Sequence, residues 1–263
     1  MDYFDITTPV WPLTGSERGA ADLAKPDERN LSYGISAEEL QSGYCQAEKS
    51  LSSSVPDELR RRITVSRDLG AYAWFCYEFH AVSSFWSISC VEMAIRWKFA
   101  EVNPGPLELR RKNEVVSVQH AELETRLRKR WQIAGIPEFD NSFRSLLKWA
   151  FTRGVLPRDI PILLQEMTHS YNNRFRCQIF PDRAKKAGLV GPNPNLSEID
   201  RAWANLGPEG QKAYMVDNAA ILIEELPRLR NEMAHPTFNM VSFPRSAIDA
   251  YRQLIEICRH LWP

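Results

Sequence analysis

Residues 71–100 read AYAWFCYEFHAVSSFWSISCVEMAIRWKFA, a stretch in which apolar and small residues occupy nearly every position. When such a sequence is placed on a helix, apolar side chains appear on most sides of it, which is typical of a buried helix. The serines and alanines between the aromatic residues allow neighbouring helices to pack closely. We therefore expect residues 71–100 to form a central helix that the rest of the chain covers.

Three of the polar residues inside this apolar stretch bear on a candidate site. His80 is expected to be a packed core histidine rather than a ligand. Glu92 and Arg96 are four positions apart, which allows an ion pair along one helix face. Two interpretations of Glu92 stay open: it belongs to a structural pair at the edge of the core, or it faces a functional site.

The segments on both sides of the central stretch carry further helix signals. Ser36 and Glu39 have the spacing of a capping box, which predicts a short helix over residues 37–50. Asn141 or Ser142 is suited to cap another helix. One-sided apolar spacing predicts helices over residues 143–152, 159–173, 197–206, 212–226 and 244–261.

Two segments lack a one-sided apolar pattern. Residues 107–133 are rich in charge and are predicted to form a solvated helix, which follows a break at Asn103-Pro-Gly-Pro106. Residues 172–197 are rich in Asn, Pro and Gly and are predicted to form a long loop. Pro227 is expected to kink or restart the helix that contains it.

Together these patterns predict an all-α fold. We expect a helical bundle over residues 61–263, with a helical and loop insertion over about residues 104–206. Residues 1–60 contain four prolines and four glycines and are predicted to be a partly irregular N-terminal extension.

Composition limits the function classes. Lys plus Arg and Asp plus Glu each number 33, so the net charge is zero and any nucleic-acid contact must come from a local patch. The five cysteines are scattered and form no C-x-x-C pair, which favours buried reduced thiols in a cytoplasmic protein. We expect no signal peptide and no transmembrane helix, because no basic region precedes an apolar stretch and no apolar run of about 18 residues occurs.

Residues 229–236 read LRNEMAHP and bring a cation, an amide and an imidazole together. On a helix, Asn231 and His235 stack on one face, while Arg230 points roughly 140° away from His235. Pro236 favours a helix end at His235, where the helix dipole favours a protonated imidazole suited to general acid and base catalysis. A helix C-cap, in which Arg230 and His235 satisfy terminal carbonyls, is the alternative interpretation.

Arg230, Asn231 and His235, with apolar flanks and a following proline, resemble the Arg-x(4–6)-His signature of the HEPN superfamily. HEPN domains are all-helical, and many are metal-independent endoribonucleases. Residues 145–157, SLLKWAFTRGVLP, are similar to a helix and turn that often lie between the two halves of such domains. The resemblance therefore implies a HEPN-like bundle that dimerises through the face carrying the motif.

The resemblance also implies a catalytic set. His235 from each chain is expected to act as acid or base, with Arg230 stabilising charge on phosphorus and Asn231 orienting the imidazole or the phosphate. Such domains often carry an acidic or polar residue on the helix facing the motif, so Glu92, with Arg96, is a supporting candidate. No metal and no cofactor is implied. The expected role is a toxin or antiphage-defence effector with RNA, a second copy and an antitoxin or defence protein as partners.

Basic residues between positions 172 and 197 are candidate RNA contacts in an otherwise neutral chain. Solubility explains such a basic segment equally well. These candidates are Arg174, Arg176, Arg183, Lys185 and Lys186.

Two other functions stay open. Arg230 and His235 can hold a dimer or bind a phosphate in a non-catalytic RNA-binding or protein-interaction module, which the zero net charge favours. A helical scaffold without any nucleic-acid role is the third reading. No phosphate-binding glycine-rich loop and no H-E-x-x-H or G-x-S-x-G motif is present in the sequence.

Overall fold

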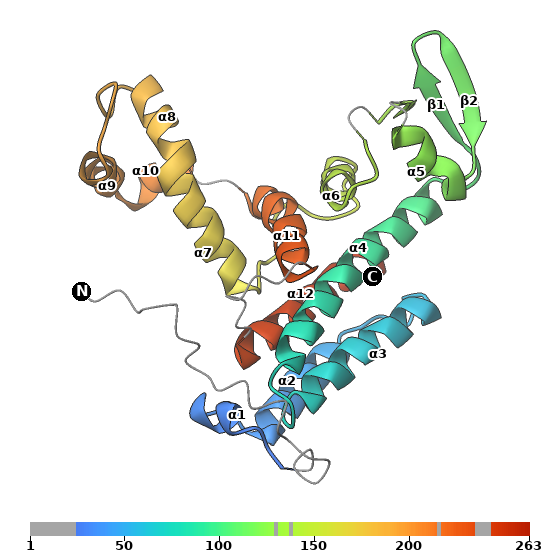
Figure 1. Ribbon diagram of the computed structural model, residues 1–263. Helices are drawn as coiled ribbons and strands as arrows, with labels where there is room; N and C mark the ends of the chain where they lie inside the picture. The colour runs from blue at the N-terminus through green and yellow to red at the C-terminus, as the bar shows by residue number, and fades with distance from the viewer. Residues whose placement is uncertain (1–24, 129–130, 137–138, 215–216, 235–242) are drawn as a thin grey trace.

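The computed structural model describes residues 25–128, 131–136, 139–214, 217–234 and 243–263. These residues form a mostly helical fold with one small three-stranded sheet (Figure 1). The prediction of a mostly helical fold is confirmed. The prediction that the fold contains no strands is wrong. Within the described residues, no helix combines the length and apolar character needed to cross a membrane.

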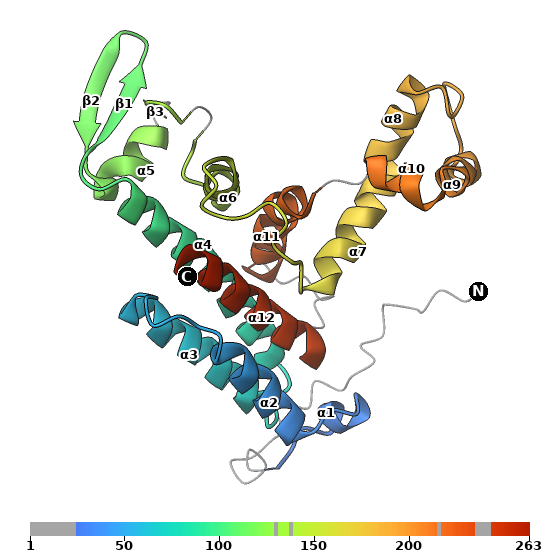
Figure 2. The same ribbon diagram turned by 180° about the vertical axis from the view of Figure 1, so that it is seen from behind.

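Helix α4 (Phe79–Val102) runs through the centre of the body, as the apolar stretch predicted (Figure 1). It packs against α3 (Asp57–Tyr72) and α12 (Pro244–Leu261), and α2 (Ala37–Glu48) covers α3 and α12. Seen from behind, α12 lies along α4 (Figure 2). Residues 37–48 are therefore part of the packed body.

The central helix begins at Phe79, so the expected helical start at residue 71 is wrong. Helix α3 ends at Tyr72, and a turn follows whose backbone groups bind to the segment around α1 (Glu28–Ser32). Asn30 Nδ2 donates to the Ala73 carbonyl at 2.8 Å, and the Tyr77 N–H donates to Asp27 at 3.3 Å. These long-range bonds satisfy the turn, and sequence periodicity does not reveal them.

Small residues allow close contact of α3 and α4. The buried Ser66 and Ser87 hydroxyls lie 2.6 Å apart, and Ser83 Oγ donates to the Ser66 carbonyl at 2.9 Å. His80 is a buried core histidine, as predicted, with Nε2 2.9 Å from Asn30 Oδ1. Ser83, Ser84 and Ser87 of the central stretch thus have hydrogen-bond partners within the core, whereas the buried Ser89 hydroxyl has none among the described residues.

Capping and amphipathic signals located several helices correctly. Ser36 and Glu39 form the predicted capping box of α2, and Ser142 caps α6 (Phe143–Thr152) by accepting from the Ser145 N–H. The predicted apolar stripe of α12 is buried at every position that we expected. Those positions are Ala247, Ile248, Tyr251, Leu254, Ile255, Cys258 and Leu261.

The predicted solvated helix over residues 107–133 is wrong for most of its length. Strands β1 (Leu107–Arg111) and β2 (Glu114–Val118) form an antiparallel hairpin, and β3 (Gln132–Ile133) pairs with β1, giving the order β2-β1-β3. Among the described residues of this segment, only α5 (His120–Arg128) is helical. Leu107 and Leu109 are buried while Glu108 and Arg110 are exposed, so the governing period is two.

The predicted loop over residues 172–197 is also largely wrong. Helix α7 (Gln165–Arg174) continues through a π-helical turn (Phe175–Ile179) into α8 (Phe180–Lys186), so the helix predicted from residue 159 starts later and runs further. Helices α9 (Leu196–Asn205) and α10 (Gly207–Tyr214) follow. Together these form an arm that projects from the body (Figure 1), which we call the α7–α10 arm.

Aromatic packing explains why the arm is ordered. The Trp203 ring from α9 lies 4.9 Å from the Phe180 ring and 5.9 Å from the Phe175 ring, measured between centroids. Phe180 is fully buried. The polar composition of the segment concealed a small apolar core that forms only when α9 folds back.

Helix α11 (Asn218–Ala234) lies between the α7–α10 arm and the body and packs on α4, α6 and α7. Pro227 lies inside it, so the helix does not restart there. Cys90 and Cys258 are buried as predicted, whereas Cys45 and Cys177 are exposed and contradict that prediction. All five thiols are free.

Candidate functional site

The motif occupies the C-terminal part of α11. Leu229 is buried, whereas Arg230 is partly exposed and Asn231 exposed, before the helix ends at Ala234. His235 and Pro236 lie outside the described residues, so the position and role of His235 stay predictions. The structure therefore locates two of the three proposed catalytic side chains.

Glu92 of α4 lies opposite the motif. Its Oε2 is 3.4 Å from Arg230 Nη2, and its Oε1 is 2.7 Å from Arg96 Nη2. The Glu92 side chain is 13% exposed, and that of Arg230 is 39% exposed. Glu92 thus contacts Arg96 on its own helix and Arg230 on α11, and its place in a functional site stays a prediction.

Hydrogen bonds fix the two arginines of this group. Arg230 Nη1 donates to Asn231 Oδ1 at 3.1 Å, and Arg96 Nη2 donates to the Asn141 carbonyl at 2.8 Å. Among the described atoms, the buried Arg230 Nε has no hydrogen-bond partner. Two guanidinium groups and one carboxylate give the group one net positive charge. We call Glu92, Arg96, Arg230 and Asn231 the Glu92 cluster.

A second ion cluster lies on α11 near the arm, and sequence reasoning missed it. Glu225 is fully buried, with Arg174 Nη2 at 3.0 Å from Oε1 and Arg228 Nε at 2.7 Å from Oε2. Arg228 Nη2 also donates to Ser170 Oγ at 2.7 Å. The adjacent acids Glu224 and Glu225 beside the apolar stripe of a predicted helix were the available signal. We call Glu225, Arg174, Arg228 and Ser170 the Glu225 cluster.

The proposed RNA-contacting residues do not gather at the Glu92 cluster. Arg174 is engaged by Glu225, and the Arg183 guanidinium lies over the Phe175 ring at 5.6 Å from its centroid. Lys185 and Lys186 are exposed on α8, which lies on the arm away from α4 (Figure 1). The side chain of Arg176 lies outside the described residues.

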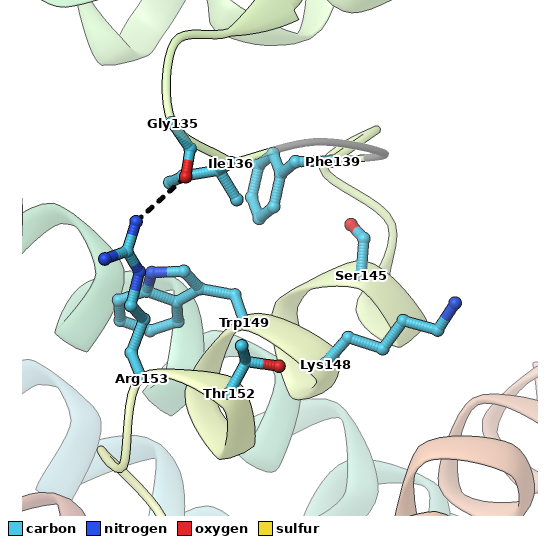
Figure 3. Close-up of a pocket in the computed structure, with 8 residues that line it drawn as sticks. All are labelled: Gly135, Ile136, Phe139, Ser145, Lys148, Trp149, Thr152 and Arg153. Atoms are coloured by element: carbon cyan, nitrogen blue, oxygen red, sulfur yellow. Dashed lines mark hydrogen bonds between the residues drawn. The ribbon is translucent and has the colours of Figure 1, made fainter.

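A pocket of about 450 Å³ lies between α6 and the loop that follows β3 (Figure 3). None of its lining residues was a predicted site residue. It is lined by Gly135, Ile136, Phe139, Ser145, Lys148, Trp149, Thr152 and Arg153.

Comparison of the chain with protein-family models, with curated proteins and with solved structures found no match. The likeness to HEPN domains therefore rests on the residues quoted above. Within the part of the chain that the structure describes, no group of three or more His, Cys, Asp or Glu side chains is placed to hold a metal ion.

Proposed function

We propose that this protein is a metal-independent endoribonuclease of HEPN type, which acts as a homodimer with two motifs at one cleft. The observation that carries the proposal is the contact between Glu92 and Arg230, because it joins the central helix to the motif helix at a partly exposed point. A net positive group at this point is suited to a phosphodiester.

In the proposed reaction, the neutral His235 imidazole of one protomer takes the proton from a ribose 2′-hydroxyl. The 2′-oxygen then forms a bond to the adjacent phosphorus, and the bond from phosphorus to the 5′-oxygen breaks. The protonated His235 of the partner gives its proton to that 5′-oxygen. The products are a 2′,3′-cyclic phosphate and a 5′-hydroxyl, so protons and electron pairs balance without a further reactant.

The Glu92 cluster supplies the electrostatic part of this proposal. Arg230 would stabilise the negative charge that develops on the phosphoryl oxygens. Glu92 and Asn231 hold Arg230 from two sides, at 3.4 Å and 3.1 Å, so they fix the direction of its guanidinium before substrate binds. Glu92 and Arg96 are therefore positioning residues in this proposal.

The test compares His235→Ala with His169→Ala, since His169 is an exposed histidine on α7. Single-stranded RNA is incubated with each protein in the presence of EDTA, and the product ends are analysed. We expect the wild type and His169→Ala to give 2′,3′-cyclic phosphate ends and His235→Ala to give none. Unchanged cleavage by His235→Ala would falsify the proposal.

A toxin or defence role in the cytoplasm extends this proposal. Expression of the wild-type protein in cells is then expected to arrest growth, while His235→Ala does not. Equal growth arrest by both proteins, at matched protein levels, contradicts the extension. A partner antitoxin would be sought among proteins that suppress the arrest by the wild type.

A non-catalytic RNA-binding or protein-interaction module is the second candidate function. The specific observation in its favour is that Arg230 is already paired with a carboxylate, in a chain of zero net charge. RNA retention by a dimer that produces no cleavage would select this module. Cleavage that depends on His235 would select the nuclease.

A further inference from the structure

The pocket beside α6 has two aromatic residues in its walls, and both pack on Phe99. The Phe139 ring stacks on Phe99 at 4.8 Å between centroids, and Trp149 meets Phe99 edge to face at 4.9 Å. Phe139 and Trp149 are each 4% exposed. Figure 3 shows Phe139 and Ile136 of the loop facing α6 across the opening. The pocket is therefore formed before any ligand enters, which lowers the entropic cost of binding.

Cationic side chains stand at the edge of this pocket. Arg153 Nη2 donates to the Gly135 carbonyl at 2.9 Å and fixes the loop over the helix (Figure 3). Lys148 is exposed, and no carboxylate among the described residues pairs with it. The described lining residues include no Asp or Glu. Apolar walls beside an ammonium that no described carboxylate pairs with are complementary to a planar ring that carries an anionic group.

We infer that this pocket binds one nucleotide of the RNA, with the base in the space that Ile136, Phe139 and Thr152 line and the phosphate at Lys148. A volume of about 450 Å³ is in the range of small-ligand sites. Unpaired RNA bases are commonly splayed out and bound against aromatic side chains. The link to RNA rests on the proposed function, whereas nucleotide binding does not.

The pocket is connected to the Glu92 cluster through the start of α6. Arg96 binds the Asn141 carbonyl, Ser142 caps α6, and Ser145 lines the pocket one turn later. A helical turn of this length spans about 5 Å. In the proposed nuclease, this chain of contacts from the Glu92 cluster to the pocket would make the pocket a base-selecting subsite for the same RNA strand.

Calorimetric titration with nucleoside monophosphates, nucleosides and inorganic phosphate tests the pocket directly. Lys148→Glu should reduce monophosphate affinity by about tenfold or more and leave nucleoside affinity unchanged, because only the phosphate contact is lost. Thr152→Trp should reduce both, because the indole fills the space between the walls. Lys49→Glu is the charge-matched control, because Lys49 is an exposed lysine after α2 and does not line the pocket.

The outcomes separate this inference from the nuclease proposal. If Lys148→Glu and Thr152→Trp both bind monophosphates as tightly as the wild type, the pocket is not the nucleotide site, whatever the cleavage result. Loss of binding in these variants, in a protein that never cleaves RNA, supports the pocket and contradicts the nuclease. If the protein cleaves RNA, Thr152→Trp should change which bases flank the cleaved bond, and an unchanged cleavage pattern overturns the base-selecting role.

Discussion

Helix α11 takes part in two ion clusters, each with one glutamate between two arginines, and the arginines around Glu225 also lie near Glu224 and Glu232. In the Glu225 cluster the carboxylate is fully buried, whereas the Glu92 side chain in the other is 13% exposed. A buried charge that loses a partner is costly, whereas a pair near solvent contributes little to stability. The Glu225 cluster therefore ties the α7–α10 arm to α11, whereas in the proposed function the Glu92 cluster is available for a substrate.

Arg228→Ala should have the largest effect on stability. It leaves the buried Glu225 with Arg174 alone and removes the bond to Ser170. We expect the free energy of unfolding in urea to fall by about 3 kcal/mol. Arg259→Ala, which breaks an exposed i,i+3 pair with Glu256 on α12, is the control. A loss below about 1 kcal/mol for Arg228→Ala would mean that burial does not distinguish the two clusters.

Arg230→Ala should separate activity from stability. In the proposed nuclease, removing a charge-stabilising donor lowers the cleavage rate by about a hundredfold. The matched control is Arg252→Ala, because Arg252 is 44% exposed and lies 3.5 Å from Asp249, much as Arg230 lies from Glu92. Cleavage rates and urea midpoints are measured for both. Equal cleavage by the two variants contradicts the assigned role of Arg230.

The buried His80 tests by pH whether a charge inside the core is costly. Burial lowers the pKa of His80 from 6.5 to about 4. Because the folded-state pKa is lowered, the neutral form stabilises the fold fully above about pH 6.5, and this stability is lost as pH falls towards 4. The expected loss between pH 7 and pH 5 is about 2 kcal/mol.

Urea unfolding at both pH values measures this loss for the wild type and for His80→Gln, which cannot titrate there. In His80→Gln, the free energy of unfolding should fall less between pH 7 and pH 5, because the part of the loss that comes from His80 is absent. An equal pH dependence in the two proteins would show that protonation of His80 does not lower the free energy of unfolding. The cost of charging a buried group would then be smaller than we expect for Glu225.

Arg96→Ala should have the smallest effect. Its pair with Glu92 lies near solvent, and its bond to the Asn141 carbonyl is partly buried, so the expected loss is below about 1 kcal/mol and smaller still in high salt. The measurement is again the urea midpoint, at low and high ionic strength. If Arg96→Ala lowers the free energy of unfolding as much as Arg228→Ala does, the Glu92 cluster stabilises the fold in the same way as the Glu225 cluster.

Local signals in the sequence were sufficient for several helices. The Ser36–Glu39 capping box and the cap at Ser142 depend on residues three positions apart, so neighbouring residues alone specify them. The apolar stripe of α12 was also predictable, because burial on one side requires a repeat close to that of the helix.

Other elements depend on contacts that the sequence pattern does not contain. The β1–β2 hairpin has only two alternating buried leucines on its first strand, too few to outweigh its many charges. The arm is helical because Trp203 returns to cover Phe175 and Phe180. The apolar signal of the hairpin is too short to be recognised, and the residue that covers the arm is distant in the sequence.

The sequence by itself determined the central apolar helix, the capped and amphipathic helices around it, and a motif of Arg230, Asn231 and His235 that predicts a chemistry. Only the tertiary structure decided that Glu92 meets Arg230, that Glu225 is buried between two arginines, and that Phe139 and Trp149 form a pocket. The physical reason is that helix propensity and periodicity act over a few residues. The burial of a charge depends on which distant helix covers it.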